Sequence, residues 1–149
     1  MLGMEVCLKN AAGQQVEVPA LLLAAFDGDE ELLAWYGTLL ESWRRYFGQW
    51  VMEPKGAEAR ERRADSLAER LLLTMEAEQE LPGFLARRIR GTRFALAGWE
   101  KMGVNVKRNY LLVLFGTRSV EAREKQVVRL VEDCARRGER TTNADPLRG

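Results

Sequence analysis

The pattern of apolar and polar positions predicts helices over most of the chain. In two segments, apolar side chains recur at the spacing i, i+3, i+4, i+7, which places them on one face of a helix. The first stripe comprises Trp43, Tyr46, Phe47 and Trp50, and the matching stripe comprises Tyr110, Leu111, Leu114 and Phe115. We expect both faces to be buried.

A longer helix is predicted after each of these segments, over residues 57–78 and 120–137. Their apolar positions correspond one to one: Ala64, Leu67, Ala68 and Leu71 in the first, and Val127, Leu130, Val131 and Cys134 in the second. Isolated helices of this length are only marginally stable, so packing of these stripes against other helices must supply their stability.

Turn and cap signals delimit two further short helices in each half. Pro19 and Pro82 are expected to begin a short helix, which Gly28 and Gly91 end. The expected N-caps of the helices that follow are Asp29 and Thr92 for the second pair and Ser42 and Asn105 for the third.

Residues 4–18 have a different, alternating pattern. The runs Glu5–Leu8 and Gln15–Val18 flank the turn-forming segment Asn10–Gly13. Such alternation around an Asn- and Gly-containing turn predicts a short β-hairpin, which is stable only if it packs on another element.

The two halves align as an internal repeat. Trp35, Arg44 and Tyr46 recur 64 residues later, and the segments 17–28 and 58–69 recur 63 residues later. Tryptophan, tyrosine, proline and glycine are not interchangeable helix fillers, so we interpret the match as a true repeat rather than chance.

These patterns predict an all-α fold made of two tandem four-helix units in one compact body. The expected division is an N-terminal segment at 1–16, helical repeats at 17–78 and 79–137, and a flexible tail at 138–149. A pair of sister repeats can close as a monomer, and a dimer is the open alternative.

Composition narrows the possible functions. The chain has 149 residues, a hydrophobic fraction of 46% and a net charge of +1, as in soluble globular proteins. It contains no histidine, which removes the commonest general base and metal ligand. Its cysteines, Cys7 and Cys134, have no metal-like spacing. We therefore expect no enzyme activity, no cofactor and no metal site. With no leader or membrane-spanning pattern, we expect a cytoplasmic protein.

An arginine–tyrosine set that occurs in both halves is the best candidate for a specific role: Arg44, Tyr46 and Arg60, then Arg108, Tyr110 and Arg123. The favoured interpretation is structural. Arg60 and Arg123, at the starts of the two long helices, would each reach a carboxylate or carbonyl on the preceding helix, and each tyrosine would be half buried with its hydroxyl paired. The functional alternative is an interaction groove for an acidic peptide or a phosphate.

A second candidate is a basic edge formed by Arg87, Arg88, Arg90 and Arg93, which acidic residues do not interrupt. Such a run can contact phosphates. The sequence has no recognition-helix motif, so nucleic-acid binding is the alternative function rather than the leading one.

The second repeat resembles the helical module of the YdeI/OmpD-associated family. The family pattern is an aromatic-Glu-x-Leu/Met segment, an Arg-x-Tyr segment, a basic residue and Glu-x-Arg. The matching residues are Trp99–Met102, Arg108–Tyr110, Arg118 and Glu121–Arg123. The resemblance covers residues 80–137 well and residues 17–72 more weakly.

The chain departs from the family pattern in two residues and in its partner domain. Val113 stands where the family usually has tryptophan, and Ala122 where it has threonine. Many family members carry a β domain before the helical module, a place taken here by the other helical copy. The resemblance implies a bacterial, non-catalytic module linked to an outer-membrane porin and to protection against bacteriocins or antimicrobial peptides. Its partner is then expected to be a protein or peptide.

Overall fold

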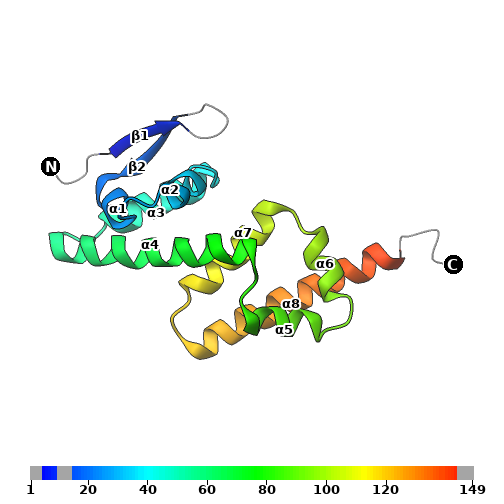
Figure 1. Ribbon diagram of the computed structural model, residues 1–149. Helices are drawn as coiled ribbons and strands as arrows, with labels where there is room; N and C mark the ends of the chain where they lie inside the picture. The colour runs from blue at the N-terminus through cyan, green and yellow to red at the C-terminus, as the bar shows by residue number, and fades with distance from the viewer. Residues whose placement is uncertain (1–4, 10–14, 144–149) are drawn as a thin grey trace. The chain divides into compact units, whose positions relative to one another are not determined.

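The structure is a computed structural model that describes residues 5–9 and 15–143. In this part of the chain two strands are followed by eight helices, labelled in Figure 1. The chain divides into two compact units, residues 1–75 (unit 1) and residues 76–149 (unit 2). The helix-dominated architecture confirms the predicted all-α class.

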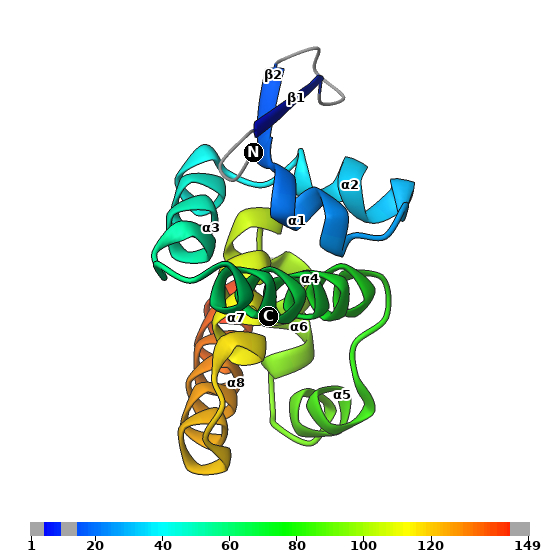
Figure 2. The ribbon, with the colours of Figure 1, turned by 90° about the vertical axis from the view of Figure 1, so that its left-hand side faces the viewer.

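The predicted hairpin is present in unit 1. Strand β1 (Glu5–Lys9) pairs antiparallel with β2 (Gln15–Pro19), with Val6 opposite Val18. The predicted turn residues 10–13 lie outside the described residues. Contacts of β2 with the first and third helices provide the packing that an isolated hairpin lacks (Figures 1 and 2).

Four helices follow in unit 1: α1 (Ala20–Ala25), α2 (Glu30–Tyr36), α3 (Glu41–Met52) and α4 (Ala57–Gln79), whose last turn belongs to unit 2. Asp29 caps α2 as predicted, because its side chain accepts a hydrogen bond of 2.9 Å from the backbone N–H of Leu32. Gly28 lies in the turn before it at φ +78°, a conformation that glycine adopts without strain.

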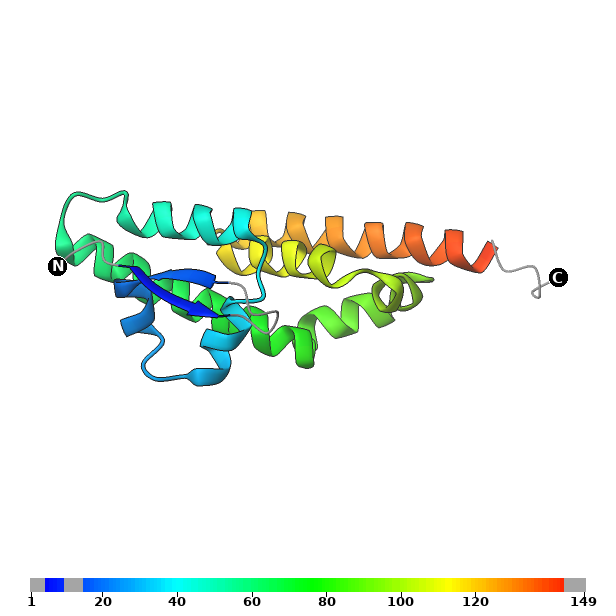
Figure 3. The same cartoon turned by 90° about the horizontal axis from the view of Figure 1, so that it is seen from above.

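Unit 2 has the same order of helices: α5 (Gly83–Arg90), α6 (Ala95–Lys101), α7 (Val104–Gly116) and α8 (Val120–Asn143). Helix α8 packs against each of the other three (Figure 3). Every residue of the two predicted apolar stripes on α4 and α8 is buried, at 8% exposure or less. Their removal from water is the main favourable contribution to each core.

The predicted tail at 138–149 is wrong for residues 138–143, because α8 continues to Asn143. Gly138 lies inside this helix and against α6, where a Cβ atom would come within 1.9 Å of the backbone oxygen of Phe94. Gly98 faces α8 in the same way, and its added Cβ would lie 1.7 Å from the backbone oxygen of Cys134. Gly138 therefore permits a close helix crossing and does not end the helix.

Three predicted caps are wrong. Thr92 does not cap α6: its hydroxyl donates to the backbone oxygen of Arg88, and Phe94 occupies the N-cap position at φ +69°. Helices α3 and α7 begin before Ser42 and Asn105, which therefore lie within their first turns. Neither of these two helices has a side-chain hydrogen bond at its N-cap.

Candidate functional site

The two arginines at the starts of α4 and α8 make the same contact. Arg60 Nε donates to the backbone oxygen of Pro54 at 2.6 Å, and Arg123 Nη2 donates to that of Thr117 at 3.3 Å. In both cases the acceptor lies six residues before the arginine, in the connection from α3 to α4 or from α7 to α8. Each arginine thus satisfies a carbonyl at the end of a helix, as the structural interpretation of these residues predicts.

Arg108 on α7 is also held within unit 2. Its guanidinium forms an ion pair with Glu78 at the end of α4, with 2.5 Å between Nε and Oε1 and 3.4 Å between Nη2 and Oε2. Only 13% of the Arg108 side chain and 19% of the Glu78 side chain are exposed. Such a shielded pair is costly to break, because the remaining charge would be left without its partner.

Arg44 in unit 1 makes a weaker contact. Its Nη1 donates to the backbone oxygen of Gly37 at 3.4 Å, and it lies partly buried on α3. Arg44 and Arg108, which align in the sequence, therefore contact different groups, a backbone carbonyl and a carboxylate.

Tyr110 belongs to a small polar cluster between α7 and α8. Its hydroxyl donates to Asp133 Oδ2 at 2.5 Å, and Arg137 Nε donates to the same oxygen at 3.2 Å. Burial and the bond to Asp133 raise the pKa of Tyr110 to about 12. Burial opposes ionisation of Asp133, but the hydrogen bonds from Tyr110 and Arg137 outweigh it and lower the pKa of this carboxyl. The half-buried tyrosine with a paired hydroxyl is the predicted structural arrangement.

Tyr46, the equivalent residue in unit 1, is different. It is 52% exposed, so the expectation that the whole α3 stripe is buried is wrong. Its ring contacts those of Trp43 and Phe47 edge to face, at centroid distances of 6.0 and 5.7 Å, and these two rings stack on each other at 5.2 Å. We call Trp43, Tyr46 and Phe47 the aromatic surface of α3. Phe47 is fully buried and anchors it.

Arginines from α4 cover the other ring faces of α3. The guanidinium of Arg70 lies 5.3 Å from the Phe47 ring, and that of Arg63 lies 4.8 Å from the Trp50 ring. Burial lowers the pKa of Arg70. The sequence interpretation did not include Arg63 or Arg70, although their recurrence at i and i+7 on α4 was a usable signal that both face the same neighbour.

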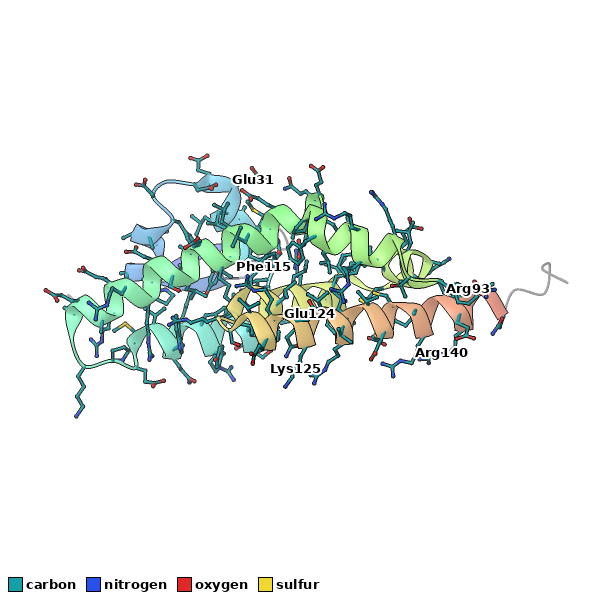
Figure 4. The ribbon with its side chains drawn as sticks, turned by 90° about the horizontal axis from the view of Figure 1, so that it is seen from below. Glu31, Arg93, Phe115, Glu124, Lys125 and Arg140 are labelled. Carbon is teal, nitrogen blue, oxygen red and sulfur yellow. The ribbon has the colours of Figure 1, made fainter. Side chains whose placement is uncertain are left out.

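The predicted basic edge lies on α5 and the turn after it. Arg88 forms an ion pair with Glu124 on α8, with 2.8 Å between the two atoms. Arg93 stacks on Phe94 at 4.7 Å and lies beside the C-terminal part of α8 (Figure 4). Arg87 and Arg90 are exposed on α5. All four residues are exposed on unit 2.

The net charge of +1 conceals an opposite charge on the two units. Residues 1–75 contain 12 acidic and 8 basic residues, a net charge of −4, whereas residues 76–149 contain 10 acidic and 15 basic residues, a net charge of +5. The two units therefore differ in the sign of their net charge, which the overall composition does not reveal.

The described part of the chain has neither a metal-binding cluster nor a membrane-spanning helix. Its histidine, cysteine, aspartate and glutamate side chains form no group of three or more that could hold a metal ion. None of its helices is both long and apolar enough to span a membrane. Cys134 is a buried free thiol whose pKa burial raises to about 11, consistent with the predicted small apolar role.

The described residues define an all-α protein with two helical units. Comparison with protein families adds a partial assignment: residues 15–73 match the model of a family described as "Bacteriocin-protection, YdeI or OmpD-Associated". The matched segment runs from β2 into α4, within unit 1. No curated protein and no solved structure matches the chain. The match supports the family that the sequence resembles, on the half where that resemblance was weaker.

Proposed function

We propose that the protein is a non-catalytic helical interaction module that protects a bacterium against bacteriocins or antimicrobial peptides. The family match of residues 15–73 supports this role. The lack of histidine and the internal contacts of Arg60, Arg108, Tyr110 and Arg123 favour binding over catalysis.

We also propose that unit 2 is a second copy of the family's helical module. Its four helices have nearly the same lengths as those of unit 1, including 23 residues in α4 and 24 in α8. The equivalent residues Arg60 and Arg123 each bind a carbonyl six positions earlier. A shared contact of this kind is expected of repeats and has no reason to recur in two unrelated helical units.

The observation that carries the proposed function is the exposure of Tyr46 within the matched segment. Half-exposed aromatic side chains on a rigid helix are typical anchors of protein interfaces. The aromatic surface of α3 also belongs to the acidic unit, whose net charge is −4. A cationic amphipathic peptide is the proposed ligand, because its apolar face can cover the exposed Tyr46 ring and the unit that carries this ring has a net negative charge.

Titration of a labelled cationic amphipathic peptide with the full chain, followed by fluorescence anisotropy, tests this proposal. We expect Tyr46→Ala to weaken binding by about tenfold or more, as for an interface anchor, and Tyr46→Phe to retain it. Val104→Ala is the matched control, since Val104 is 62% exposed but lies in unit 2.

A bacterial strain that expresses the chain supplies the second readout. Survival on exposure to the peptide should rise with the wild-type protein and fall back with Tyr46→Ala at equal expression. If the peptide does not bind, or if Tyr46→Ala and Val104→Ala bind it as well as the wild type does, the proposed function is wrong.

A further inference from the structure

The basic edge of unit 2 consists of Arg87, Arg88 and Arg90 on α5 and Arg93 in the turn after it, and all four residues are exposed. Leu85 and Ile89 of this helix are fully buried in the core of unit 2, so the remaining faces of α5 point outward. No acidic residue occurs between Leu81 and Trp99 in the sequence. The edge therefore lacks the interleaved carboxylates that neutralise most charged helix faces.

The contacts of the four arginines leave much of this charge available. Among the described residues, only Arg88 has a carboxylate at ion-pairing distance, Glu124 at 2.8 Å. Both partners of that pair are about half exposed, at 44% and 55%, and exposed ion pairs contribute little stability. A competing anion can therefore replace Glu124 at small cost.

A purely structural role accounts for only part of the edge. Basic residues in the last turn of a helix complement its dipole, which applies to Arg87, Arg88 and Arg90. It does not apply to Arg93, which follows the helix. The equivalent short helix of unit 1, α1, has no basic residue in its last turn. A helix at this position can therefore form without these arginines.

An exposed aromatic ring accompanies the positive charge. Phe84 is 41% exposed and precedes Arg87 and Arg88 by three and four residues, so its ring lies next to both on the helix surface. Aromatic side chains that stack on bases, combined with basic residues that contact the backbone, are the means by which many proteins bind single strands.

We propose that the basic edge and Phe84 bind a single-stranded nucleic acid. The arginines contact the phosphates and the Phe84 ring stacks on an unpaired base, so binding depends little on sequence. A duplex fits less well, because its bases are already stacked and leave Phe84 without a partner. A lipid surface also fits less well, because α5 buries Leu85 and Ile89 in the core and leaves Phe84 as its one exposed large apolar side chain.

Binding of a labelled oligothymidylate of about 16 nucleotides to the full chain, measured by anisotropy, tests the proposal. With three phosphate contacts, log Kd should rise with log salt at a slope of about 2, so affinity falls roughly twentyfold between about 50 and about 200 mM salt. Phe84→Ala should weaken binding by about tenfold, and Phe84→Trp should retain it.

A pair of charge reversals separates the site from the general charge of unit 2. Arg87→Glu/Arg90→Glu should abolish binding, whereas Lys125→Glu/Arg129→Glu should retain most of it. The control changes the net charge by the same amount at exposed positions on α8, where Lys125 is marked in Figure 4. Circular dichroism verifies that each variant is folded.

Four outcomes would overturn the proposal. The first is that oligothymidylate does not bind at low salt, and the second is that the two double variants lose the same amount of affinity. The third is that a duplex of the same length binds as tightly as the single strand and that Phe84→Ala does not change the affinity. The fourth is that the protein binds only to vesicles of anionic phospholipid. Binding by the wild type that Phe84→Ala and Arg87→Glu/Arg90→Glu weaken, and Lys125→Glu/Arg129→Glu does not, would support it.

Discussion

Replacement of Gly98 by alanine tests the close crossing of α6 and α8. A Cβ atom on Gly98 would lie 1.7 Å from the backbone oxygen of Cys134 and 2.9 Å from the backbone nitrogen of Gly138. Both neighbours are main-chain atoms of a helix, so no side chain can rotate away. The methyl group can be accommodated only if the two helices move apart.

Helix propensity alone predicts that Gly98→Ala raises the free energy of unfolding, whereas the close crossing predicts that it lowers it. Alanine in place of glycine within a helix normally gains about 1 kcal/mol. Overpacking of a well-packed core costs typically 1–3 kcal/mol, and the contact with rigid backbone places Gly98→Ala at the upper end. After the propensity gain, we expect a net loss of about 2 kcal/mol in the free energy of unfolding. With a urea m-value of about 2 kcal/mol/M, the midpoint should fall by roughly 1 M.

Urea unfolding followed by circular dichroism and by tryptophan fluorescence measures this change, with Trp99 reporting on unit 2. Gly48→Ala is the matched control, because Gly48 is also inside a helix but its added Cβ would make an ordinary contact of 3.5 Å with Pro19. That variant should be as stable as the wild type or more so. If Gly98→Ala is also neutral or stabilising, the close approach of α6 and α8 is refuted.

Two further predictions concern the polar contacts of unit 2. Arg108→Met should lower the free energy of unfolding by about 2 kcal/mol, because it removes the arginine that pairs with the shielded Glu78. Arg45→Met, which breaks the exposed pair with Glu41, should change it by less than about 0.5 kcal/mol. Thermal melts of the two variants measure the difference, and equal melting temperatures would contradict the structural role of Arg108. Unfolded tyrosine ionises near pH 10, and Tyr110 has a folded pKa of about 12, so its contribution to stability is complete below about pH 10 and is lost as the pH rises towards 12. Urea unfolding at several alkaline pH values should show a shallower decline for Tyr110→Phe, and parallel declines would contradict this contribution.

Local sequence rules predicted the parts of the fold that depend on neighbouring residues. The alternating runs around residues 10–13 identified both strands, and Asp29 identified the start of α2. The apolar stripe of α4 predicted four buried positions, including Leu67 and Leu71, because helical periodicity determines which residues share a face.

The errors occurred where a distant element decides the outcome. Gly138 has the same local signal whether it ends a helix or lies at a crossing, and its neighbour Gly98 is 40 positions away in the sequence. Tyr46 has the same limitation: periodicity placed it on the Phe47 face, but the area that a neighbouring element covers leaves it 52% exposed. Neither the helix crossing at Gly138 nor the exposure of Tyr46 can be predicted from the residues next to it in the sequence.

The candidate site was predictable only in its arginines and tyrosines, and not in their partners. Arg108 and Tyr110 were identified because they repeat, whereas Glu78 and Asp133 come from other helices and give no local signal beyond their charge. Asp133 is only 8% exposed although it is a carboxylate among the buried positions of α8. A charged residue so close to an apolar stripe requires a polar partner, and its position was the one available indication of the cluster.

The two units share core and helix-end contacts but differ in the charge of their surface residues. Arg60 and Arg123 make the same contact, and the equivalent residues Leu22 and Leu85 are both fully buried. The surfaces instead carry net charges of −4 and +5. Surface charge affects partner choice far more than it affects the fold. Two units with the same order of helices can therefore bind different ligands, as proposed above. The peptide and oligothymidylate titrations test this directly: Tyr46→Ala should affect only peptide binding, and Arg87→Glu/Arg90→Glu only oligonucleotide binding.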